Sequence, residues 1–360
     1  MAIAATFLLM GAQAAAYGPL LQPLTHRFGV SLPVAGAAIS ANFLGALLAV
    51  GACFWLFPRT PGRWLVWGGL AIAALGGVGV ALASDWPLFL LAVALVGLGA
   101  GALDMTLTNL IAHSEGSRRT ALLNAVNGAY GLGAVLGPVL VALAAADLTR
   151  LFGGGALLAL ALIPALRGIR GRLPHEPDPG RPGRNSLVAL FMGAFILYVG
   201  VEVGVGGWMP SHLESLGHSS SAAALLTSGY WLTFALGRLL APLLPSRLPE
   251  GAVVLGGAAL AMVTLLLAAA GPLAPAGYLL TGLAIAPIWP TAVAWLARRR
   301  PRDARATSWL FPAAMVGGAL IPGAVGLLLG RVGLGWTPVI LAVVAAGSLA
   351  AFGLAARSRG

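Results

Sequence analysis

Three charged side chains stand well inside long apolar stretches of the sequence: Asp104, Glu202 and Arg238. A charge at the centre of a membrane-spanning helix costs roughly 2.5–3.5 kcal/mol on insertion scales, so such residues usually face a cavity or a partner. A carboxyl group in that position can bind and release a proton, and a guanidinium group can pair with it. These three residues are therefore the first candidates for chemistry.

Asp104 lies in the stretch GLGAGALDMTLTN, and at helical spacing it shares a face with Gly97, Gly101 and Thr108. Such a small and polar stripe favours a carboxyl group that couples proton binding to ligand binding. The alternative is a protonated or hydrogen-bonded acid whose effect is limited to helix packing. We expect proton coupling at Asp104.

Glu202 lies in YVGVEVGVGGWMP, one helical turn after Tyr198 and on the same face. Glycines weaken the helix around Glu202, and they stand at 200, 204, 206 and 207. Pro210 disrupts the helix further along, so we expect a locally unwound segment, which a membrane tolerates where it lines water or protein. Glu202 is accordingly a second candidate for proton coupling; the alternative is a structural ion pair with Arg238.

Arg238 stands near the end of its apolar segment, in GRLLAPLLPSR. Its long side chain can extend to the membrane surface without any further role. Otherwise it pairs across helices and helps to hold one conformation closed, so we treat it as a gating or ion-pair candidate.

Polar side chains on other segments are candidates for substrate binding. Gln13 and Tyr17 are one turn apart, as are Asn124 and Asn127. Buried amides need partners, and contact between helices and contact with substrate both satisfy the asparagines.

Trp289 stands between Pro287 and Pro290, where the prolines predict a broken helix. An aromatic face beside amide and carboxylate groups suits sugars and other polar rings, although Trp289 can equally serve packing. The predicted substrate-binding set is Gln13, Tyr17, Asn124, Asn127, Tyr198 and Trp289.

The sequence offers no convincing catalytic set. His113, Ser114 and Glu115 are adjacent at a helix end, and that spacing gives no triad geometry. There is no phosphate-binding loop after a strand and no Cys/His cluster for a metal. We therefore predict neither an enzyme nor a cofactor or metal site.

The elements that position these residues follow from composition. Hydrophobic residues make up 59% of the chain and charged residues 9%, so the solvent around most of it must be lipid. The 51 glycines fit membrane helices, which associate through small residues. We predict an all-α membrane protein, expected as a monomer in the bilayer.

The apolar runs predict twelve membrane-spanning segments. They are 2–24, 32–57, 64–84, 87–113, 120–146, 148–166, 187–213, 222–244, 251–270, 276–297, 306–330 and 335–356. The polar, proline-rich stretch RGIRGRLPHEPDPGRPGRNS divides them equally. We predict two six-helix bundles, 1–168 and 187–360, joined by a cytoplasmic linker loop, 169–186.

All 21 basic residues are arginines, and 17 of them fall in alternate loops against three in the opposite loops. We predict a multi-pass protein of the inner (plasma) membrane of a cell. The positive-inside rule then places both termini and the linker on the cytoplasmic side. This distribution argues against nucleic acid as the partner of a chain with net charge +11. The first segment lacks a basic flank, so we expect a retained helix rather than a signal peptide.

An internal repeat supports two equivalent halves: SRRTALLNAVNGAYGLGAVLGP opens the fifth segment and DARATSWLFPAAMVGGALIPG the eleventh. Parallel six-helix repeats are used by one class of transporters to form a site between their halves.

Over essentially its full length the chain resembles the major facilitator superfamily, and within it the fucose-permease-like sugar–proton symporters. The resemblance rests on ALLNAVNGAYGLG, YVGVEVGVGGW, APIWPTAVAW and GLGAGALDMTLTN, in which Asp104 matches the group's protonatable acid. It implies alternating access, a mid-membrane site lined by the first, fourth, fifth, seventh and tenth segments, and a small polar substrate, expected to be a sugar, moved with protons.

One alternative is a proton-driven drug or metabolite exporter of the same fold, because GAVLGP is similar to an exporter motif. Another is a membrane receptor or scaffold that transports nothing. A channel is disfavoured, since no segment has a repeated polar ring.

Overall fold

The computed structural model describes residues 1–114, 119–169, 186–241, 247–301, 303 and 306–358. The described residues are helical, with turns between helices and no strand. The chain divides into two compact units, Met1–Asp178 and Pro179–Gly360. The predicted linker, 169–186, falls almost wholly outside the described residues, as does Glu115.

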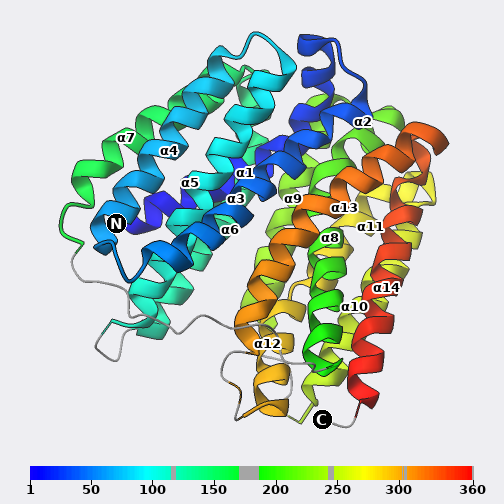
Figure 1. Ribbon diagram of the computed structural model, residues 1–360. Helices are drawn as coiled ribbons and strands as arrows, with labels where there is room; N and C mark the ends of the chain where they lie inside the picture. Colours follow the sequence, from blue (N-terminus) through cyan, green and yellow to red (C-terminus); the bar gives the residue numbers. More distant parts are fainter. Residues whose placement is uncertain (115–118, 170–185, 242–246, 302, 304–305, 359–360) are drawn as a thin grey trace. The chain divides into compact units, whose positions relative to one another are not determined.

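Unit 1 contains the first six predicted segments (Figure 1). Its helices are α1 (Ala2–Phe28), α2 (Leu32–Ala35), α3 (Ala37–Leu56), α4 (Gly62–Leu82), α5 (Trp86–Ala112), α6 (Arg119–Leu143), a π-helical turn (Thr149–Gly153) and α7 (Gly154–Ala165).

Unit 2 contains the other six. Its helices are α8 (Ser186–Ser215), α9 (Ser220–Leu240), α10 (Glu250–Ala268), α11 (Ala274–Ile285), α12 (Ile288–Arg299), α13 (Leu310–Val332) and α14 (Thr337–Arg357). Short 3₁₀ turns precede three of them, at Gly271–Leu273, Thr307–Trp309 and Leu334–Trp336.

Ten helical stretches of the described chain are long and apolar enough to cross a membrane. The two other predicted segments correspond to the shorter apolar stretch Thr149–Ala165 and to α9. The prediction of an all-α membrane fold is therefore confirmed, and most helix ends differ from the expected ends by only a few residues. Such agreement is expected because lipid forces backbone groups to bond within helices.

Helix pairing follows the same plan in both units. In unit 1, α1 packs along α6, α3 along α5, and α4 along α7. In unit 2 the corresponding pairs are α8 with α13, α9 with α11, and α10 with α14. This pairing agrees with the internal repeat that joins the fifth segment to the eleventh.

Glycines bring the paired helices close together. A Cβ added at Gly11, Gly133 or Gly137 would overlap the facing backbone at the α1–α6 contact. One at Gly317 would overlap the backbone of Ile196 at the α8–α13 contact. Gly133 and Gly137 are the glycines of GAVLGP, and their place at this contact is explained by helix packing.

The expected unwinding around Glu202 is wrong, because α8 continues without a break from Ser186 to Ser215. The glycines there make room for neighbouring side chains instead: a Cβ at Gly200 would meet Ile321, at Gly204 Leu341, and at Gly206 Trp231. The break expected at Trp289 is confirmed, since α11 ends at Ile285 and α12 begins at Ile288.

Candidate functional site

Glu202 and Arg238 come together in unit 2, from the adjacent helices α8 and α9. Their closest charged atoms, Oε2 and Nη2, are 3.9 Å apart, which is too long for a hydrogen bond but close enough for an ion pair. The side chains are 16% and 38% exposed, respectively. The structure therefore supports the ion-pair interpretation of both residues.

The guanidinium of Arg238 lies 4.2 Å from the centre of the Phe234 ring, one turn earlier in α9. It points back along the helix, away from the end at Leu240. This orientation differs from that of an arginine extended to the membrane surface. The face of Phe234 and the carboxylate of Glu202 both attract the cation.

Tyr230 fixes the backbone beside the acid. Its hydroxyl donates a hydrogen bond to the carbonyl oxygen of Glu202 over 2.9 Å, and its side chain is fully buried. Tyr230, Phe234 and Arg238 are spaced four residues apart, so one face of α9 carries all three contacts.

Two buried polar atoms in this cluster have no hydrogen-bond partner among the described residues. They are the hydroxyl of Tyr198, a residue that is 1% exposed, and Oε2 of Glu202. The Tyr198 hydroxyl lies within electrostatic range of both Glu202 and Arg238. Buried polar atoms are usually hydrogen-bonded, so these two are an unusual feature of the cluster.

Aromatic rings extend the cluster toward α12. The ring of Phe195 lies 6.0 Å from that of Tyr198 and 5.1 Å from that of Trp289, in both cases edge to face. Trp289 is half-buried and also contacts Phe311 at 6.4 Å. The structure thus gathers Tyr198, Glu202, Arg238 and, through Phe195, Trp289.

Asp104 is half-buried on α5 in unit 1. Its Oδ1 accepts a hydrogen bond of 3.2 Å from Thr108, one turn along the helix. Among the described residues no arginine pairs with it. On the same helix, Gly97 packs against the backbone of Asn42 and Gly101 against that of Ala46, so the small stripe serves the α3–α5 contact.

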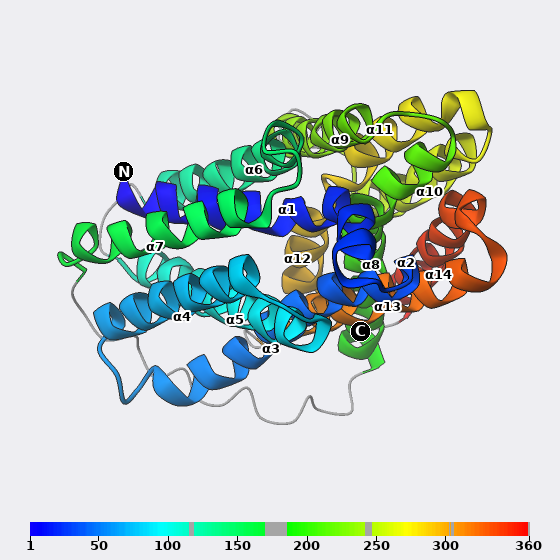
Figure 2. The ribbon, with the colours of Figure 1, turned by 90° about the horizontal axis from the view of Figure 1, so that it is seen from above.

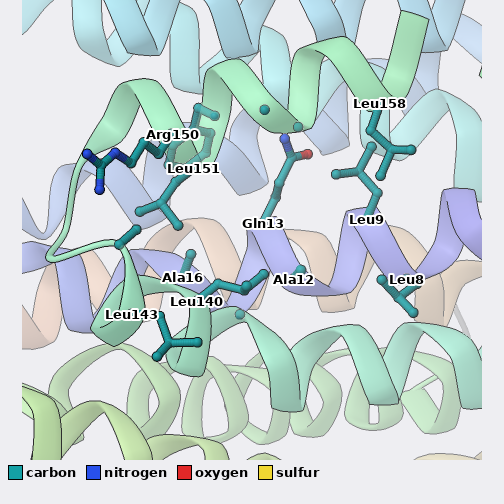
Figure 3. Close-up of a pocket in the computed structure, with 15 residues that line it drawn as sticks. Leu8, Leu9, Ala12, Gln13, Ala16, Leu140, Leu143, Arg150, Leu151 and Leu158 are labelled. Atoms are coloured by element: carbon teal, nitrogen blue, oxygen red, sulfur yellow. The ribbon is translucent and has the colours of Figure 1, made fainter. Parts of the chain in front are cut away.

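Tyr17 is buried inside unit 1, where the amide of Asn42 donates to its hydroxyl at 3.4 Å. Its ring lies 5.6 Å from that of Phe152. The neighbouring candidate, Gln13, points from α1 toward α7 into a pocket lined by leucine and small residues (Figure 3). One helix therefore gives the two residues different surroundings.

Asn124 and Asn127 are exposed on α6, contrary to the expected burial. The amide of Asn127 donates to the carbonyl of Leu123 in its own helix at 2.8 Å, so it does not join two helices through that bond. A role in substrate binding stays a prediction for both residues.

Sequence reasoning missed Tyr230, Phe234 and Phe195. The spacing of Tyr230 and Phe234 at four-residue intervals before Arg238 was a usable signal. Phe195, three residues before Tyr198, gave none that separates it from other apolar positions of α8. Among the described residues no group of histidine, cysteine and acidic side chains could hold a metal ion.

Long apolar helices in two units with the same helix pairing, some of which carry charged and polar groups, form the architecture of a membrane transporter. The chain belongs to the Major Facilitator Superfamily, whose family model matches residues 3–273. The expected membership of this superfamily is thereby confirmed.

Protein TsgA of Shigella flexneri is 23% identical over 247 residues, which are 64% of this chain and 62% of TsgA. The match therefore spans less than two thirds of that relative. Among solved structures, the D-xylose-proton symporter has a TM-score of 0.82 at 17% identity, covering 97% of this chain and 95% of its own. The Escherichia coli fucose:proton symporter FucP has a TM-score of 0.66 at 17% identity, covering 99% and 98%. These structural similarities show the fold.

Proposed function

We propose that the protein moves a small polar solute, a sugar, across the membrane by alternating access and couples this movement to protons. The observation that carries the proposal is the pair of buried atoms without hydrogen bonds, the Tyr198 hydroxyl and Oε2 of Glu202. A sugar hydroxyl can donate to the carboxylate and accept from the phenol. Two sugar–proton symporters share the fold, which agrees with this substrate class.

The neighbouring groups suit a sugar for separate reasons. Arg238 donates hydrogen bonds from a rigid, planar group, and its positive charge lies beside the carboxyl group of Glu202. The half-buried ring of Trp289 offers an apolar face for the C–H side of a sugar ring. Tyr17, Asn124 and Asn127 are further proposed contacts from unit 1, whereas Gln13 points into a separate pocket of that unit.

Asp104 is the proposed proton carrier. Its carboxyl group lies on a membrane-spanning helix with a threonine as its described partner, whereas Glu202 has an arginine. An unpaired carboxylate is costly in such surroundings, and proton binding removes that cost. Protonation of Asp104 therefore lowers the free-energy cost of the conformational change in the loaded transporter. Glu202 serves primarily in solute binding.

The proposal is tested by counterflow of radiolabelled solutes in proteoliposomes, with sugars and lipophilic cations offered as competitors. Tyr198→Phe, which removes one hydroxyl, is expected to raise the KM for the transported sugar about tenfold. Tyr278→Phe is the matched control, because that hydroxyl bonds His212 at 2.8 Å elsewhere in unit 2. Competition by lipophilic cations but not by sugars would favour the exporter, and no exchange of any solute would contradict transport.

A further inference from the structure

A pocket of about 470 Å³ lies inside unit 1, between α1, α6 and the π-helical turn with α7. Figure 3 shows Leu9, Ala12 and Gln13 reaching it from α1, with Leu140 and Leu143 from α6. The volume is within the range of small-molecule sites, roughly 300–1,000 Å³. The residues proposed for solute binding in unit 2 do not line this pocket.

The pocket exists because α7 stands away from α1. Seen from above, α1 lies between α6 and α7, but it contacts α7 at few positions (Figure 2). In unit 2 the equivalent helix α14 packs closely along α8, with Ser348 donating to the carbonyl of Ala194 at 3.2 Å. The π-helical turn Thr149–Gly153 leads into α7 on the pocket wall, and π-helical turns are frequent at functional sites.

The floor of the pocket holds one polar side chain. Gln13 is 9% exposed, and none of the hydrogen bonds of the described residues involves its amide. The amide nitrogen faces Gly155, where an added Cβ would lie 2.8 Å from it (Figure 3). An amide left without partners among leucines is costly, so its position points to a ligand with a hydrogen-bonding group.

The rim of the pocket is apolar and open. Leu140, Leu143 and Leu158 are 46%, 77% and 41% exposed, on helical stretches apolar enough to lie in a membrane. Leucines exposed there contact lipid tails, so an apolar chain can enter sideways. Arg150 lies at one end of the pocket, and its side chain is largely exposed. Its Nε is 3.3 Å from Oδ2 of Asp147, so the two residues form an ion pair without net charge.

We propose that this pocket binds one acyl chain of a bilayer glycerophospholipid with a zwitterionic headgroup. The chain lies along the leucines, the ester carbonyl accepts a hydrogen bond from the Gln13 amide, and the phosphate lies at Arg150 with the ammonium near Asp147. Gly155, which faces Gln13, follows Arg150 by five residues, or about 7.5 Å along a helix. That offset suits an ester and a phosphate joined by one glycerol backbone.

The test uses full-length protein in vesicles that contain phosphatidylcholine with a photoactivatable diazirine in one acyl chain. After illumination, adducts are mapped by mass spectrometry of the peptides. The wild type is expected to carry adducts concentrated on residues 8–16 and 151–158. Gly154→Leu adds a side chain at the pocket wall, where nothing lies within 4 Å of its Cβ, and is expected to lower these adducts about fivefold.

Gly51→Leu is the matched control, because Gly51 also has open space around it but does not line the pocket. It is expected to leave the adducts at 8–16 and 151–158 unchanged. Gln13→Leu keeps the apolar volume and is expected to lower them about fivefold through loss of one hydrogen bond. Adducts spread evenly over exposed leucines of all helices, or equal labelling in Gly154→Leu and Gly51→Leu, would overturn the proposal.

Discussion

The hydroxyl of Tyr230 donates a 2.9 Å hydrogen bond to the backbone carbonyl of Glu202, which joins α9 to α8 beside the acid of the proposed solute site. Tyr230→Phe removes this bond without changing the ring. We expect the free energy of unfolding to fall by about 1 kcal/mol and the KM for solute to rise, because Glu202 loses its fixed position. Thermal denaturation in detergent and counterflow measure the two effects.

Thr264→Val is the control for that variant. The hydroxyl of Thr264 bonds that of Thr281 at 2.8 Å and so joins α10 to α11 without touching Tyr230 or Glu202. A similar loss of stability with an unchanged KM is expected. An effect on KM equal to that of Tyr230→Phe would refute a specific positioning role for Tyr230.

The Glu202–Arg238 pair predicts non-additive mutations. Glu202→Gln or Arg238→Gln alone leaves one charge without its partner, whereas the double variant leaves none. Since Arg238 is 38% exposed, solvent screens part of the attraction, and we expect a coupling energy of about 1 kcal/mol. A double-mutant cycle on thermal stability measures it; additive losses would contradict the pair.

Replacing glycine by alanine is expected to have opposite effects on stability at a tight helix contact and at an open position. Gly317→Ala adds a Cβ where the backbone of Ile196 already lies, so we expect a loss of about 2 kcal/mol or more. Gly353→Ala meets open space on α14 and is expected to stabilise by about 0.5–1 kcal/mol. The melting temperatures of the two variants in detergent measure these effects. Equal melting temperatures would contradict the close α8–α13 contact.

Two alanines in the turn after α6 adopt left-handed backbone angles, with φ of 50° at Ala145 and 58° at Ala146. A side chain is strained there and glycine is not. Ala145→Gly is expected to raise the free energy of unfolding by about 1 kcal/mol. Ala142→Gly, inside α6, should lower it instead; a lower melting temperature for Ala145→Gly would be inconsistent with the strain.

The sequence was sufficient for most of the fold because lipid imposes simple rules. Apolar length located the membrane helices, and the repeat anticipated equivalent pairing in both units. The glycines around Glu202 led to the wrong prediction of an unwound helix. A glycine can either weaken a helix or leave space for a side chain of a neighbouring helix, and only the positions of Ile321, Leu341 and Trp231 distinguish the two effects.

The site was predicted in part for a similar reason. Glu202 and Arg238 stood out because charges are rare in apolar helices, and their opposite charges made an ion pair one of the alternatives. Tyr230 was missed because its role depends on which helix its hydroxyl reaches. The pocket beside Gln13 depends on the spacing between α1 and α7, which no local pattern in the sequence records.

Proton movement caused by solute is the measurement that tests the account most directly. Proteoliposomes containing a trapped pH-sensitive dye receive the transported sugar with no imposed pH gradient, for the wild type, Asp104→Asn and Asp85→Asn. Asp85 is a control acid at the exposed start of the same helix, where asparagine also caps. We predict that the wild type and Asp85→Asn move protons on sugar addition, and that Asp104→Asn exchanges sugar but moves none. Equal proton movement in all three would contradict the role of Asp104.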